Sequence, residues 1–113
     1  MTLIMKLFTK PDCGQCPMAK NVAQKVSADL WVELKEFNID EVDGLAEAQF
    51  HQVLATPSII LVDDDEEFIE LAGWRSEIPS HQELTIKVQE LKKQLEEKQN
   101  AKKSEEEEVQ SKS

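Results

Sequence analysis

The chain of 113 residues is long enough for one domain with a hydrophobic core of its own. Its net charge of −10 at pH 7 disfavours nucleic acid and anionic membranes as partners. The sequence contains neither a recognisable signal peptide nor a run of about 18 apolar residues that could span a bilayer. We therefore expect a cytoplasmic protein whose acidic surface serves solubility or contact with basic patches on other proteins.

The first part of the chain predicts two strands that flank a helix. The apolar run 3–9 is typical of a buried strand, and loose alternation over 31–39 predicts a second strand with a bulge near Glu36. Between them a helix is expected over about 15–29, with Pro17 in the first turn, where its missing N–H costs little. The expected apolar stripe of this helix consists of Met18, Val22, Val26 and Leu30.

A short second helix and a hairpin are expected next. Asp43 is the predicted N-cap of the helix, which must stop before Pro57. The apolar positions that mark this helix are Ala46, Phe50, Val53 and Leu54. The hairpin consists of a strand over 58–62, a polar turn over 63–66 and a return strand over 68–72.

The last predicted element is a helix, and a charged tail follows it. Residues 73–75 are expected to leave the sheet, and Ser80 and Glu83 have the spacing of a capping box. The apolar seam of the helix consists of Leu84, Val88, Leu91 and Leu95. Residues 98–113 hold four lysines and four glutamates, so the whole charge of −10 falls on residues 1–97. We therefore expect a folded domain over 1–97 and a disordered tail, or a frayed helical extension, over 98–113.

The predicted elements define a fold class. Their order is β-α-β-α-β-β-α. A strand–helix–strand unit forms a right-handed crossover, so the first two strands should be parallel, and the hairpin adds antiparallel strands. The sequence therefore predicts an α/β fold with a four-stranded mixed sheet and helices on both faces.

The chemistry is expected at the two cysteines, Cys13 and Cys16. Cys13 lies just before the predicted helix, whose unpaired N–H groups and macrodipole favour a thiolate over a thiol. Lys10 would support that effect and Asp12 would oppose it. Cys16, one turn further along, should be more buried and remain a thiol. The pair therefore predicts that Cys13 attacks a disulfide and that Cys16 resolves the mixed disulfide, with Gly14 letting a partner's backbone come close.

Other interpretations of the cysteines stay open at this point. They could be buried free thiols, although their place in a loop argues against it. Cys-x-x-Cys is also half of many zinc sites, but His51 and His81 stand alone, so we expect no metal site within one chain. A metal ion or iron–sulfur cluster shared between two chains is an alternative, as is an interaction module that the redox pair merely switches.

Residues 3–95 resemble the thioredoxin superfamily and are most similar to glutaredoxins. The segment 9–16, Thr-Lys-Pro-Asp-Cys-Gly-Gln-Cys, is similar to the active-site segment of the glutaredoxin-like hydrogen donors of ribonucleotide reductase (NrdH-type redoxins). Residues 73–75, Gly-Trp-Arg, resemble the Gly-Phe-Arg of the same proteins. The resemblance implies a thioredoxin-like fold and a dithiol that reduces protein disulfides.

The resemblance also gives roles to residues that are ambiguous by themselves. Thr56-Pro57 could be a plain helix stop or a cis bond, and Gly73 and Trp74 could be only a turn and a core aromatic. In the superfamily, residues 55–57 fall on the cis-proline loop, which implies that Pro57 is cis and faces the cysteines while the Thr56 backbone pairs with an extended substrate. The substrate-binding residues so implied are Lys10, Gly14, Gln15, Thr56, Pro57, Gly73 and Trp74.

The departures from the family bear on the electron source. Residues 72–75 lack the Gly-Gly-x-Asp-like turn of glutaredoxins that use glutathione, so we expect electrons from a thioredoxin-reductase-like enzyme. The expected reduction potential lies between about −270 and −200 mV. We expect a monomer without a cofactor that donates electrons to disulfide-containing proteins, with ribonucleotide reductase as one candidate acceptor.

Overall fold

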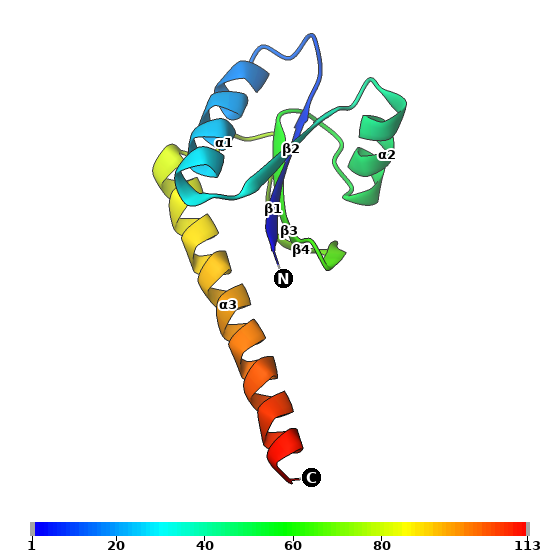
Figure 1. Cartoon of the computed structure of the whole chain (residues 1–113). Coiled ribbons are helices and arrows are strands. Elements are labelled where there is room, and N and C mark those ends of the chain that lie inside the picture. Colours follow the sequence, from blue (N-terminus) through cyan, green and yellow to red (C-terminus); the bar gives the residue numbers. More distant parts are fainter. Residues whose placement is uncertain (1, 113) are drawn as a thin grey trace.

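The computed structural model describes the backbone of residues 2–112 and the side chains of residues 2–98. Its elements are β1 (Leu3–Thr9), α1 (Cys16–Leu30), β2 (Glu33–Asn38), α2 (Val42–Phe50), β3 (Ser58–Asp63), β4 (Glu66–Arg75) and α3 (His81–Lys112). The strands form a four-stranded sheet in the order β2-β1-β3-β4, in which only the β1–β2 pair is parallel. Helices α1 and α3 lie on one side of the sheet and α2 on the other (Figure 1). The predicted mixed α/β fold is therefore confirmed.

Strand β1 is buried on both faces because helices cover both sides of the sheet. Successive side chains of a strand point to opposite faces. The side chains packed toward α1 and α3 are those of Leu3, Met5 and Leu7, and those on the α2 side are those of Ile4, Lys6 and Phe8. All six residues are at most 4% exposed. Burial of each large apolar side chain stabilises the fold by about 1.5–3 kcal/mol, so β1 is a firm base for the loop that follows it.

Helix α1 packs on the sheet through smaller side chains than the sequence predicts. Its buried residues are Cys16, Ala19, Ala23 and Val26. Val22 and Leu30 lie at the edge of the contact, whereas Met18 is 64% exposed and does not belong to the stripe. Alanine lets a helix backbone approach a sheet closely, and this brings the first turn of α1 near the end of β1.

The hairpin and the second strand differ from the prediction in two respects. The β1–β2 register is regular through the pair Leu7–Glu36, so the bulge expected near Glu36 is absent. The irregular register lies between β3 and β4, on either side of Val62. Strand β4 also continues through Arg75, which pairs with Ser58, and residues 73–75 therefore stay in the sheet.

Helix α2 begins earlier than expected. Its N-cap is Glu41, which makes no capping side-chain bond, and Asp43 lies in the first turn instead. The buried residues of the helix are Gly44 and Ala48, whereas Phe50 is exposed. Among the positions expected to mark this helix, Val53 is buried beyond the end of the helix and Leu54 is exposed.

Helix α3 carries its apolar seam as predicted, with Leu84, Val88, Leu91 and Leu95 buried. Half of the capping box forms, because the Glu83 N–H donates to Ser80 Oγ at 3.0 Å. The helix continues to Lys112, which is the helical extension that the sequence allowed as the alternative to a disordered tail. The division into a domain and a tail at residue 97 stays a prediction. Within residues 2–112, no helix has both the length and the apolar character needed to cross a bilayer.

We predict that Gly44→Ala destabilises the fold. An added Cβ would lie 1.9 Å from the carbonyl oxygen of Asn38, at the end of β2, and backbone cannot easily move aside. The expected loss in free energy of unfolding is about 3 kcal/mol, against the small gain that alanine normally gives within a helix. Urea denaturation measures it.

The matched control is Gly14→Ala, whose added Cβ would meet nothing within 4 Å. It should change the free energy of unfolding by less than about 0.5 kcal/mol. Equal stability of the two variants would contradict the close approach of α2 to the end of β2.

Candidate active site

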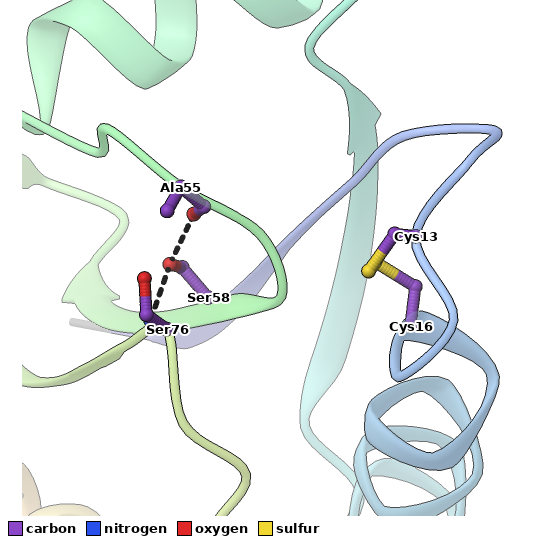
Figure 2. The surroundings of a disulfide bond; sticks show 5 residues. All are labelled: Cys13, Cys16, Ala55, Ser58 and Ser76. Carbon is purple, nitrogen blue, oxygen red and sulfur yellow. Dashed lines mark hydrogen bonds between the residues drawn. A yellow bond between two sulfur atoms is a disulfide. The ribbon is translucent and has the colours of Figure 1, made fainter.

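The two cysteines lie where β1 leads into α1. They form a disulfide with a Cα–Cα distance of 5.4 Å at the first turn of α1 (Figure 2). Cys16 is buried, with 5% of its surface exposed, whereas Cys13 is partly exposed. Cys16 is thus the more buried of the two residues, as the sequence predicts.

Two backbone hydrogen bonds between residues three positions apart lie within the connecting loop. The Cys13 N–H donates to the Lys10 carbonyl at 3.3 Å, and the Cys16 N–H donates to the Cys13 carbonyl at 3.4 Å. Gln15 is the N-cap of α1 but makes no side-chain capping bond, and no acidic residue lies in the first turn. No carboxylate within the first turn of α1 therefore offsets the positive end of the helix dipole, which favours negative charge on a nearby sulfur, although Asp12 just before Cys13 acts against it.

A hollow of about 350 Å³ lies beside the disulfide. Its lining consists of Thr9, Lys10, Pro11, Cys13, Cys16, Pro17, Lys20 and Glu36. Lys10 thus lies at the site as predicted. Lys20 and Glu36 form an ion pair at 3.4 Å across α1 and β2, and sequence reasoning missed both because only the β1–β2 crossover brings them together.

The loop between α2 and β3 lies across from the disulfide (Figure 2). The Thr56–Pro57 bond is cis, as the resemblance implied, and Pro57 is buried. In Figure 2 the stretch from Ala55 to Ser58 bends toward the side on which the disulfide lies. The Thr56 hydroxyl is buried and has no hydrogen-bond partner among the described residues.

Trp74 and Gly73 lie away from the hollow beside the disulfide. Trp74 is 6% exposed, belongs to the core cluster beneath α1 and α3, and donates from Nε1 to Glu83 Oε1 at 3.1 Å. It is a core residue and not a surface for substrate. Gly73 lies within β4 opposite Ile60, and neither residue lines the hollow beside Cys13.

A partly buried polar cluster lies on the α2 side of the sheet, next to the start of this loop. Lys6 Nζ lies 3.0 Å from Glu47 Oε2, 3.1 Å from Glu67 Oε1 and 3.0 Å from His51 Nε2. An ammonium group only donates, so His51 Nε2 is the acceptor and carries no proton. Burial and the positive charge of Lys6 lower the pKa of His51 below 6.5, although Glu47, Glu70 and Glu67 act in the opposite direction. His51 follows α2 directly and begins the segment that ends at Pro57.

Comparison with known proteins identifies relatives of this chain. No family model matches it. It is 33% identical over 61 residues to a probable thioredoxin of Archaeoglobus fulgidus, covering 54% of this chain and 67% of that one. It is 31% identical over 65 residues to a thioredoxin of Methanocaldococcus jannaschii, covering 58% and 75%. The structure of a thioredoxin from Trypanosoma brucei brucei superposes with a TM-score of 0.65 at 18% identity, covering 81% and 76%, which shows the same fold.

The fold, the paired cysteines and these relatives define a thiol–disulfide oxidoreductase that acts on proteins. The chain belongs to the thioredoxin superfamily. In the part of the chain that the structure describes, no group of three or more His, Cys, Asp or Glu side chains is arranged to hold a metal ion.

We predict that His51 makes folding stability depend on pH. Because its folded-state pKa lies below 6.5, the unfolded chain binds a proton first as the pH falls. The free energy of unfolding should therefore decrease from about pH 6.5 downward until the pH reaches the folded-state pKa. Urea denaturation at about pH 7.5 and 5.5 measures this loss for the wild type and for His51→Gln, in which the amide oxygen can still accept from Lys6.

His81→Gln is the control, since His81 has half of its side-chain surface exposed on α3. This variant should lose stability with falling pH as the wild type does, while His51→Gln should lose less. The same pH dependence in all three proteins would show that His51 does not titrate differently on folding.

Proposed function

We propose that the chain reduces disulfides of protein substrates, with Cys13 as the nucleophile and Cys16 as the resolving residue. The observation that supports this order is the unequal exposure of the two residues at the start of α1. A substrate disulfide can approach Cys13, while Cys16 stays shielded until a mixed disulfide has formed beside it.

The reaction starts from the reduced protein. The Cys13 thiolate attacks one sulfur of the substrate disulfide, forms a mixed disulfide and releases the other substrate sulfur as a thiolate, which takes up a proton. Cys16 loses its proton and attacks Cys13 Sγ, which releases the second substrate thiolate and forms the Cys13–Cys16 disulfide. Two electrons have then passed from the dithiol to the substrate.

Substrate docking is assigned to the two loops beside the disulfide. We propose that the Thr56 backbone, next to Pro57, pairs with an extended substrate segment. Gly14 and Gln15 are exposed between the cysteines and leave room for its backbone. Lys10 supplies a positive charge that favours the Cys13 thiolate.

A reductase is the proposed electron source, because residues 72–75 lack the Gly-Gly-x-Asp-like turn of glutaredoxins that use glutathione. Ribonucleotide reductase is a candidate acceptor, on the strength of the Thr-Lys-Pro and Cys-Gly-Gln-Cys segments. A cytoplasmic location and a monomeric state belong to the same proposal.

We expect Cys13→Ser to abolish reduction of insulin disulfides, because the attacking sulfur is gone. Cys16→Ser should instead accumulate a mixed disulfide between Cys13 and the substrate, since no second thiol resolves it. Turbidity of precipitating insulin chains measures the first outcome, and non-reducing electrophoresis with mass spectrometry measures the second.

Full activity of Cys13→Ser would contradict the proposal, and so would trapping by Cys13→Ser in place of Cys16→Ser. The alternative of a metal or iron–sulfur cluster shared between chains makes a different prediction. Protein purified without oxygen would then show a cluster or charge-transfer absorbance that both cysteine variants lose.

A further inference from the structure

The Ser58 hydroxyl bridges the loop that faces the disulfide and the segment that follows β4 (Figure 2). Ser58 is fully buried at the start of β3. Its Oγ donates to the Ala55 carbonyl at 2.8 Å and accepts from the Ser76 N–H at 3.3 Å. Figure 2 shows the three residues joined in this way, across from Cys13 and Cys16.

The two bonds close the loop on which substrate docking depends. Ala55 and Ser58 enclose Thr56 and Pro57, so the bond from Ser58 Oγ to Ala55 fixes both ends of that short stretch. The Thr56 hydroxyl has no partner among the described residues and does not contribute to this closure. Leu54, just before the stretch, is 94% exposed and adds little packing. The hydrogen bond from the Ser58 hydroxyl is therefore a principal interaction that holds the loop in place.

The end of β4 holds the same segment at a second point. Arg75 Nη2 donates to the His51 carbonyl at 2.7 Å, at the end of α2, and the guanidinium group is itself oriented by Glu70 at 2.5 Å. The next residue, Ser76, supplies the N–H that Ser58 accepts. Arg75, the last residue of β4, and Ser76, which follows it, thus hold the beginning and the end of segment 51–58.

We propose that Ser58, together with Arg75, is a positioning residue for protein substrates. The inference rests on the proposed function, in which the Thr56 backbone pairs with an extended substrate segment. A docked segment presents its disulfide to Cys13 only if the loop keeps a fixed position relative to α1. A loop that is already held in its bound conformation loses less freedom when substrate binds, so a loop freed from Ser58 should dock substrate less well.

The test compares Ser58→Ala with Ser27→Ala. Ser27 is a matched control because its Oγ also donates to a backbone carbonyl, that of Val32 at 2.5 Å, at the opposite end of α1. Each full-length variant is assayed with insulin, which must dock, and with the small disulfide 5,5′-dithiobis(2-nitrobenzoate), which needs no docking. Circular dichroism sets the assay temperature below the melting point of every variant, and thiol titration counts the active molecules.

Ser58→Ala should raise the KM for insulin by about fivefold or more, since it leaves the Ala55 carbonyl and the Ser76 N–H unpaired. Its kcat, and its rate with the small disulfide, should match the wild type. Ser27→Ala should lose comparable stability without a change in KM. Equal KM values for Ser58→Ala and the wild type, or equal rises in both variants, would overturn the inference.

Arg75→Gln removes the second hold and decides the question if Ser58→Ala does not fold. A KM for insulin that stays at the wild-type value in Arg75→Gln would then overturn the inference. Failure of the proposed function has a different signature: the wild-type protein would reduce the small disulfide but not insulin.

Discussion

The burial of β1 on both faces is the constraint on which the other parts of the site depend. Its alternate side chains pack beneath α1 and α3 on one side and beneath α2 on the other, so the strand is fixed across the sheet. The loop that carries Cys13 starts at the end of this strand and enters α1 within a few residues. The position of Cys13 is therefore set by the buried strand, and only a short loop separates the residue from the end of that strand.

The same strand also supports the opposite side of the site. Lys6 lies in the middle of β1, and its ammonium group binds His51, from which the chain leads to the cis-proline loop. Glu47 and Glu67 balance its charge, which a buried lysine requires. Strand β1 thus fixes the position of the cysteine loop, which starts at its end, and that of the cis-proline loop, through the Lys6 side chain.

The fold was predictable because its signals are local. Apolar runs, the Ser80 capping position and the turn after Asp63 identified the strands and helices, and the spacing of Cys13 and Cys16 at a helix start identified the reactive pair. The seam of α3 was equally clear, since its four leucine and valine positions repeat over three turns.

The features that the sequence did not predict depend on contacts between distant segments. Met18 fits the helical spacing of an apolar face, but it is exposed. The side of α1 that faces the sheet is set by the close packing of Ala19 and the other small buried residues, which the spacing alone does not reveal. Lys6 is a charged residue in an apolar run, and its partners come from α2 and β4. The Ser58 side chain likewise binds a residue 18 positions further along the chain, and no sequence motif predicts this hydrogen bond.

We propose that Cys13 and Cys16 are chemically unequal, because Cys13 lies partly exposed before a helix and Cys16 is buried within its first turn. Alkylation of the reduced protein by iodoacetamide, followed by mass spectrometry of each cysteine over a range of pH, measures this inequality directly. We expect Cys13 to react first, with a midpoint below the value of about 8.5 for an ordinary thiol, while Cys16 reacts slowly. Equal rates at the two cysteines, or faster reaction of Cys16, would contradict it.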